Sequence, residues 1–127
     1  MNKVSKNQME KLPYIIAVDF DGTLVEDRFP NIGRPIWKTI GEIQNRQSNG
    51  AKIILWTCRD HENLKEAIEY CENNLHIVFD AVNTNIEETK NMFDNDTRKV
   101  YANEYWDDKC AIRYANKNLE FNRYERI

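Results

Sequence analysis

Residues 14–24 read YIIAVDFDGTL. The first five residues, 14–18, are an almost wholly apolar run, and this run stops at an acidic turn. Short apolar runs of this kind are typical of strands buried on both faces of a parallel sheet. Asp19 and Asp21 place two carboxylates where the predicted strand ends, and Gly22 allows a sharp turn just after them. Because ligands of open parallel sheets bind at the carboxyl ends of the strands, this turn is the first candidate for a functional site.

Two other segments that are predicted to contain strands also end in polar residues. Residues 52–56 lead into Thr57-Cys58-Arg59, and residues 100–106 lead into Asp107-Asp108. A third strand is predicted over residues 77–82. The carboxyl ends of parallel strands meet at one edge of a sheet, so we expect the three polar clusters to converge there.

Helical patterns separate the predicted strands. Apolar residues recur at helical spacing over 36–49 and 60–74, with Asp60 as a candidate cap for the second helix. A third helix is predicted over residues 87–93. Alternating strands and helices predict an α/β fold, a Rossmann-like three-layer sandwich around a mainly parallel central sheet. The length of 127 residues fits a short polar leader over residues 1–12 and a single α/β domain over residues 13–127.

Composition excludes several classes of function. The net charge of −3, from 18 basic and 21 acidic residues, carries no strong electrostatic signature of nucleic-acid binding. No apolar run is long enough to span a bilayer, so no membrane partner is expected. The three cysteines are an odd number without a CxxC pair, which favours a reducing, cytoplasmic location over a disulfide framework.

The acidic clusters predict a metal site. Clustered carboxylates repel one another unless a cation lies among them. Oxygen ligands without nearby His or Cys favour Mg²⁺ as the cofactor. Beside a metal, one carboxylate can attack phosphorus while a second protonates the leaving oxygen, with Thr57 and Lys99 as candidate contacts to the phosphate.

These motifs resemble those of the haloacid dehalogenase-like (HAD) hydrolases. Residues 18–24 match the first motif, an apolar strand followed by DxDGT, and residues 53–57 resemble the second, an apolar strand ending in Ser or Thr. Residues 105–108 resemble the fourth motif in its DD form. Lys99 fits the third-motif lysine because compact members place an Arg-Lys pair shortly before the DD motif, and Lys90 is the competing candidate.

The resemblance implies a Mg²⁺-dependent phosphatase that hydrolyses a phosphomonoester through an aspartyl-phosphate on Asp19. Asp19 would also bind the metal, and Asp21 would be the general acid/base and hold Mg²⁺ through its backbone carbonyl. Asp108 is the expected nearer metal ligand and Asp107 the more distant one, although the two roles can be exchanged. The other residues of the predicted site contact phosphate or substrate: Thr57 and Lys99 in catalysis, and Gly22, Thr57, Cys58, Arg59 and Arg28 in substrate binding.

The spacing of the motifs resembles that of the minimal members without a cap domain. Neither the gap from Asp21 to Thr57 nor the gap from Thr57 to Lys99 is long enough for a cap. An open site fits a phosphorylated small molecule or a polynucleotide end as substrate, and it is compatible with a homo-oligomer that covers the site. The acid at position 21 favours phosphate chemistry, because the phosphatases of this family carry Asp there and its dehalogenases do not.

Two alternatives compete with the phosphatase. The first is a non-catalytic metal- or phosphate-binding regulatory module that acts through a protein partner, as receiver-like domains do. Such a module has no reason to carry Asp21-Gly22-Thr23 directly after the phosphate-accepting Asp19. The second is a phosphotransferase or mutase, which needs water kept out of a site that the spacing predicts to be open.

Overall fold

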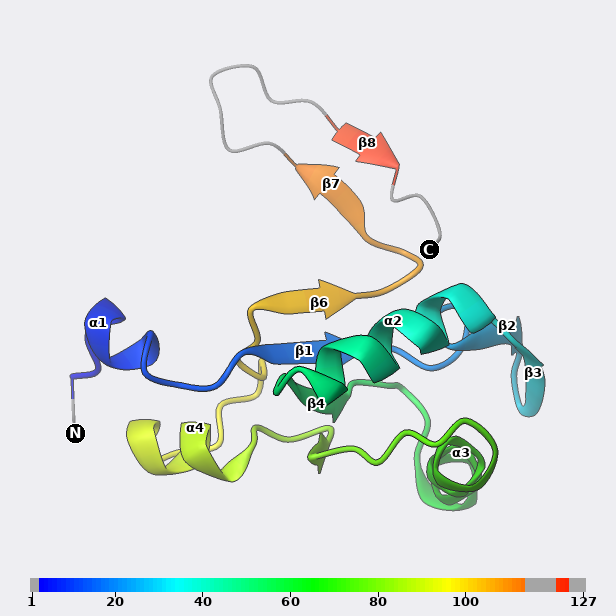
Figure 1. The fold of residues 1–127 in the computed structure, drawn as a ribbon, viewed down its shortest axis with the longest axis horizontal. Helices are drawn as coiled ribbons and strands as arrows, with labels where there is room; N and C mark the ends of the chain where they lie inside the picture. The colour runs from blue at the N-terminus through cyan, green and yellow to red at the C-terminus, as the bar shows by residue number, and fades with distance from the viewer. Residues whose placement is uncertain (1–2, 114–120, 124–127) are drawn as a thin grey trace.

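A central parallel sheet organises the protein, which we describe from a computed structural model over residues 3–113 and 121–123 (Figure 1). Its four strands lie in the order β5-β4-β1-β6, and neighbouring strands pair in parallel. They are β1 (Ile15–Val18), β4 (Lys52–Leu55), β5 (Ala81–Val82) and β6 (Glu104–Trp106). The prediction of an α/β fold with a mainly parallel sheet is confirmed, and the layout is Rossmann-like.

The three predicted helices are all present. They are α2 (Trp37–Ser48), α3 (His61–Asn74) and α4 (Glu87–Phe93), and a short helix α1 (Lys6–Met9) lies in the predicted leader. Asp60 occupies the N-cap position of α3, as predicted, but its side chain makes no capping hydrogen bond and instead lies 3.8 Å from His61 Nε2.

The burial of β1 explains its apolar sequence. Ile16 and Val18 pack in a core cluster with residues of α2 and α3, whereas Ile15 and Ala17 pack on the opposite face with Ile86 at the start of α4. Every residue of β1 is therefore buried, on one face or the other. The packing on both faces therefore fixes the position of the C-terminal end of β1, which is followed by Asp19.

The third strand is much shorter than predicted. Only β5, from Ala81, pairs with β4, because the preceding backbone is engaged elsewhere. The Ile77 N–H donates to the Cys71 carbonyl of α3, and the Gln47 side chain donates to the Val78 carbonyl. The segment reaches the sheet only at Asp80, whose carboxylate accepts the N–H of Ile53.

The fourth strand, predicted within residues 100–106, is β6, which begins at Glu104. The Tyr101 N–H donates to the Asn85 side chain, and Asn103 pairs with Ile15 through both its N–H and its side-chain oxygen. Val100 is buried as predicted for an apolar segment, but it lies outside the ladder.

Two antiparallel hairpins complete the described chain. Strands β2 (Val25–Arg28) and β3 (Asn31–Pro35) form a hairpin between β1 and α2. Strands β7 (Ala111–Arg113) and β8 (Phe121–Arg123) form an antiparallel pair near the C-terminus.

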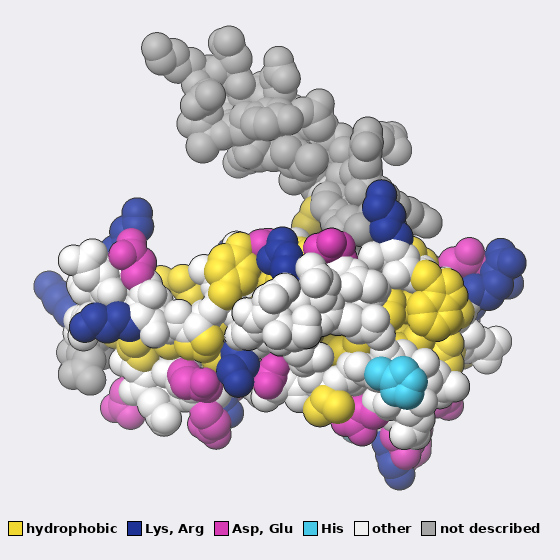
Figure 2. Space-filling view, in the orientation of Figure 1, with side chains coloured by type: hydrophobic (Ala, Val, Ile, Leu, Met, Phe, Trp, Pro, Cys, Tyr) yellow, Lys and Arg dark blue, Asp and Glu magenta, His cyan; other side chains and the backbone are white. Residues whose placement is uncertain are grey.

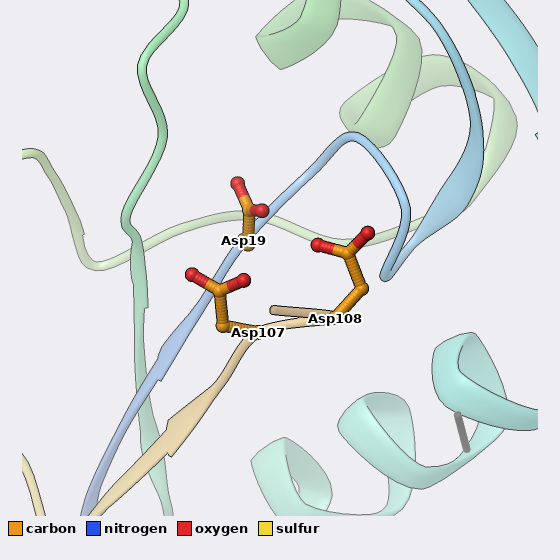
Figure 3. Close-up of side chains that lie close together, drawn as sticks. All are labelled: Asp19, Asp107 and Asp108. Atoms are coloured by element: carbon orange, nitrogen blue, oxygen red, sulfur yellow. The ribbon is translucent and has the colours of Figure 1, made fainter. Parts of the chain in front are cut away.

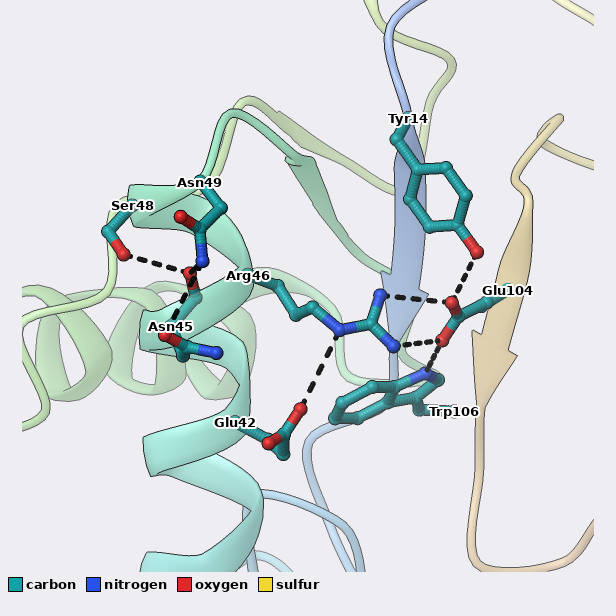
Figure 4. Close-up of polar contacts among 8 residues, drawn as sticks. All are labelled: Tyr14, Glu42, Asn45, Arg46, Ser48, Asn49, Glu104 and Trp106. Atoms are coloured by element: carbon teal, nitrogen blue, oxygen red, sulfur yellow. Dashed lines mark hydrogen bonds and ion pairs between the residues drawn. The ribbon is translucent and has the colours of Figure 1, made fainter.

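A polar cluster fastens the edge strand β6 to α2 (Figure 4). Arg46 donates two hydrogen bonds to the Glu104 carboxylate, at 3.0 and 3.2 Å, and Glu104 also accepts from Trp106 Nε1 and from the Tyr14 hydroxyl. The guanidinium lies 5.8 Å from the centroids of both the Tyr14 and Trp106 rings. Paired charges with several hydrogen bonds hold their geometry well. The cluster therefore fixes the strand that ends at Asp107.

The surface mixes charges of both signs. On the face in Figure 2, acidic and basic side chains are interspersed without one continuous basic patch. Within residues 3–113 and 121–123, no helix combines the length and the apolar character that a membrane crossing requires.

Candidate functional site

Three carboxylates meet at the carboxyl ends of β1 and β6 (Figure 3). Asp19, Asp107 and Asp108 each offer one oxygen, and these oxygens all lie within 4.8 Å of one another. The Asp19 N–H donates to the Trp106 carbonyl at 2.9 Å, which extends the β1–β6 ladder to the acids. Both members of the predicted Asp107-Asp108 pair therefore join Asp19, as the sequence predicted.

The surroundings of Asp19 disfavour its charged form. Burial, together with the nearby carboxylates of Asp107, Asp108 and Asp21, raises the pKa of Asp19 from its usual 3.8 to about 7, against the opposing effect of the Phe20 N–H, which donates to Asp19 Oδ1 at 2.8 Å. The same environment, with burial as the main cause, raises the pKa of the Cys110 thiol. An added cation would relieve this repulsion.

This geometry predicts a pH-dependent stability in the absence of metal ions. A carboxyl whose folded-state pKa is raised binds more protons in the folded than in the unfolded protein, so stability falls as pH rises from about 4 to about 7. In EDTA at pH 8, we expect Asp19→Asn to melt about 3–6 °C above wild type, the shift that roughly 1 kcal/mol produces in a domain of this size. The margin should shrink towards pH 5 in thermal melts. A margin that does not change with pH, or an equal gain in Asp60→Asn, would contradict this origin.

The donor set fits a hard divalent cation. The group consists of carboxylate oxygens, which are the ligands that Mg²⁺ prefers, and a cation with few protein ligands retains water in its other positions. Gly22 lies against the same group, since a Cβ there would stand 2.2 Å from Asp108 Oδ2. The absence of a side chain at position 22 lets the Asp108 carboxylate approach the turn.

Asp21 and Arg59 form a buried ion pair beside the carboxylates. Arg59 Nε donates to Asp21 Oδ2 at 2.7 Å, and Nη2 donates to Oδ1 at 2.8 Å. The Arg59 side chain is 1% exposed and that of Asp21 is 15% exposed. This pairing raises the pKa of Arg59, so the guanidinium stays charged.

The carboxylates open into a cavity of about 620 Å³. Thr57 stands at the end of β4, where its N–H donates to Asn83 Oδ1 at 2.8 Å and its hydroxyl oxygen accepts the Arg59 N–H at 3.1 Å. A hydroxyl that accepts one hydrogen bond can still donate its own hydrogen to a bound anion. The ends of all four sheet strands and the β2–β3 hairpin line the cavity, through Asp19, Asp21, Asp27, Phe29, Trp56, Thr57, Cys58, Arg59, Asn83, Asp107 and Lys109.

Comparison with known proteins places the chain in a family. No protein-family model matches the sequence, and no curated protein is significantly similar. A solved structure of a conserved protein from Bacteroides thetaiotaomicron is 38% identical, covers 76% of each chain and superposes with a TM-score of 0.66. The chain belongs to the same family as this protein. The description of that relative as a conserved protein assigns no reaction, so function has to be argued from the site itself.

The structure brings most of the predicted site residues together. Six of them line the cavity, namely Asp19, Asp21, Thr57, Cys58, Arg59 and Asp107. Asp108 belongs to the acidic group, and Gly22 lies against it. The Arg59 guanidinium pairs with Asp21, and its side chain is almost completely buried, so it does not face open solvent.

Three predicted residues lie elsewhere. Lys99 precedes β6, at the end of the strand opposite to Asp107, and its Nζ lies 5.3 Å from the centroid of the Tyr105 ring. Lys90, the competing candidate, pairs with Glu87 within α4 at 3.8 Å. Arg28 lies 3.9 Å from Glu26 on the hairpin. None of the three is among the described residues that line the cavity.

A different lysine lies at the site. Lys109 lines the cavity, and its Nζ lies 3.6 Å from Asp108 Oδ2. Sequence reasoning missed it because the family pattern places the lysine before the DD motif, whereas here one follows directly after it. Position after a strand that ends at the site was the signal that could have identified Lys109, together with Trp56 at the end of β4.

Proposed function

We propose that the protein is a Mg²⁺-dependent phosphatase that hydrolyses a phosphomonoester through an aspartyl-phosphate on Asp19. One observation carries the proposal. Asp19 lies within a group of three carboxylates whose oxygens are within 4.8 Å of one another, and it shares a cavity with Asp21 and Thr57. This combination supplies a nucleophile, a cation site, a second acid and a phosphate contact in one place.

The side chains of Asp19, Asp107 and Asp108 would hold the cation, and the backbone carbonyl of Asp21 is proposed as a further ligand. When bound, Mg²⁺ would offset the negative charge of the phosphate and of the attacking carboxylate. Asp19 has the geometry of a nucleophile because its carboxylate lies at the end of a fully buried strand and is oriented by the Phe20 N–H.

In the proposed reaction, Asp19 is the nucleophile, and Asp21 is first the general acid and then the general base. An Asp19 oxygen forms a bond to phosphorus while the bond from phosphorus to the ester oxygen breaks, and Asp21 gives a proton to the departing oxygen. In the second step Asp21 takes a proton from water, and the resulting hydroxide attacks phosphorus, which releases inorganic phosphate and restores Asp19. The Thr57 hydroxyl and the Cys58 N–H are proposed to donate to phosphate oxygens. Lys109 is proposed as the neighbouring cation in place of Lys99.

We also propose that the protein resembles the HAD-like hydrolases that have no cap domain. In the described part of the chain, the β2–β3 hairpin is the only folded insertion between β1 and α2. An open cavity accommodates a phosphorylated small molecule or a polynucleotide end, and a second copy of the chain could cover it. A cytoplasmic location is part of this proposal, and it is supported by free thiols at Cys58, Cys71 and Cys110.

Release of inorganic phosphate with and without Mg²⁺ tests the proposal. The panel should contain 4-nitrophenyl phosphate, nucleoside monophosphates, sugar phosphates and oligonucleotides with 3′- or 5′-phosphates. We expect turnover with Mg²⁺ and a loss of roughly 10²-fold or more in EDTA, because three carboxylates cannot accept a phosphate dianion without a cation. Absence of release from every substrate would contradict the proposal and favour the regulatory module.

A further inference from the structure

The guanidinium of Arg59 makes five hydrogen bonds, three of which end on backbone carbonyls. Beyond the two to Asp21, Nη1 donates to the Pro30 carbonyl at 3.1 Å and to the Asn63 carbonyl at 3.3 Å, and Nη2 donates to the Asn31 carbonyl at 2.9 Å. An arginine side chain has five N–H donors, so its hydrogen-bonding capacity is used in full. These partners belong to the hairpin turn and to the first turn of α3.

Aromatic rings complete the environment of this guanidinium. Its central carbon lies 5.0 Å from the centroid of the Phe20 ring and 5.1 Å from that of the Phe29 ring. Phe20 is fully buried, whereas Phe29 is 54% exposed and lines the cavity. Arg59 therefore connects three structures that are separate in sequence: the turn after β1, the β2–β3 hairpin and the start of α3.

We propose that Arg59 is a positioning residue that sets the orientation of the Asp21 carboxylate and couples it to the β2–β3 hairpin. The inference rests on the proposed function, in which Asp21 carries the proton to the leaving oxygen. Both Asp21 oxygens accept hydrogen bonds from Arg59 in the structure, so to act as the acid Asp21 must give up one of these hydrogen bonds and take up a proton from solvent. The three carbonyl contacts keep the guanidinium in place during that exchange, and Phe29 gives a substrate in the cavity a direct contact with the coupled unit.

Dependence on the leaving group distinguishes this role from a structural one. An acid matters most for a poor leaving group such as the alkoxide of an alkyl phosphate, and least for 4-nitrophenolate, which departs without a proton. Because Asp21 also activates water in the second step, which is common to all substrates, the comparison uses kcat/KM, which reports the steps up to the departure of the leaving group. We expect Arg59→Lys and Asp21→Asn to lower kcat/KM roughly 10²–10³-fold on glycerol phosphate and less than about 10-fold on 4-nitrophenyl phosphate. The double variant should be no worse than Asp21→Asn alone, because the two residues act as a unit.

Several outcomes would overturn the inference. Equal losses on the two substrates would indicate a general structural defect, and additive losses in the double variant would mean that the residues act independently. Phe29→Leu serves as a second variant if Arg59→Lys does not fold, because it keeps an apolar side chain at an exposed position and removes only the ring over the guanidinium. It should lower the ratio of kcat/KM on glycerol phosphate to kcat/KM on 4-nitrophenyl phosphate about 3–10-fold, the effect of one cation–π contact, and an unchanged ratio would refute the coupling.

The controls separate this inference from the proposed function. An inactive wild-type protein on both substrates would refute the phosphatase and the positioning role together. An active wild-type protein whose Arg59→Lys variant keeps the wild-type substrate ratio would refute only the positioning role. Thermal melts with and without Mg²⁺ confirm that each variant is folded before its rates are compared.

Discussion

Replacing Asp19 with asparagine is expected to lower phosphate release on the order of 10³-fold or more. The amide keeps an oxygen that can accept the Phe20 N–H, so the turn should survive, but it has no anionic oxygen to attack phosphorus. It also removes one charge from the three-carboxylate group, which should weaken Mg²⁺ binding. Initial rates at saturating Mg²⁺, with the best substrate of the panel, measure the effect.

A surface variant provides the control for this loss. Asp60 undergoes the same change of side chain, its carboxylate is 78% exposed, and it lies outside the acidic group. Asp60→Asn should keep wild-type rates. Because Asp19→Asn is expected to melt above wild type without metal, a loss of activity cannot be ascribed to unfolding. A rate for Asp19→Asn within tenfold of wild type would show that Asp19 is not the attacking group.

The convergence of the acids could be predicted from sequence because the signals involved are local. The apolar run before Asp19 specifies a strand that is buried on both faces, and the polar residues after β1, β4 and β6 must then meet at one edge of a parallel sheet. Neither step depends on distant side chains. This is why Asp19, Thr57 and Asp107 could be named from the sequence and lie around one cavity in the structure.

The remaining parts of the site depend on tertiary contacts. The pairing of Arg59 with Asp21 depends on where the hairpin places the Pro30 and Asn31 carbonyls, and no local pattern encodes that position. Lys99 was chosen by its distance from the DD motif along the chain. Because Lys99 precedes β6, it lies at the end of the strand opposite to the acids. A competing hydrogen bond to α3 likewise shortened the strand that was predicted over residues 77–82.

Gly22→Ala is expected to have a large effect although it replaces none of the carboxylates. Gly22 has φ of +85°, and an added Cβ would stand 2.2 Å from Asp108 Oδ2 and 2.6 Å from its Cγ. The Asp108 side chain is too short to bend away while its oxygen stays within the group around Asp19. We therefore expect the Asp108 carboxylate to leave the group, with a loss of activity of roughly 10²-fold or more, since displacements of about 1 Å have such effects in active sites.

Gly50→Ala separates this clash from the cost of backbone strain. Gly50 has φ of +100°, but a Cβ there meets nothing within 4 Å. Both variants should lose about 1–2 kcal/mol of stability from the left-handed backbone. Only Gly22→Ala should also lose phosphate release and the rise in melting temperature on addition of Mg²⁺. If both variants retain that Mg²⁺-dependent rise and wild-type rates, the approach of Asp108 to the turn is not needed for the site. If only Gly22→Ala loses them, the missing side chain at position 22 is part of the metal centre.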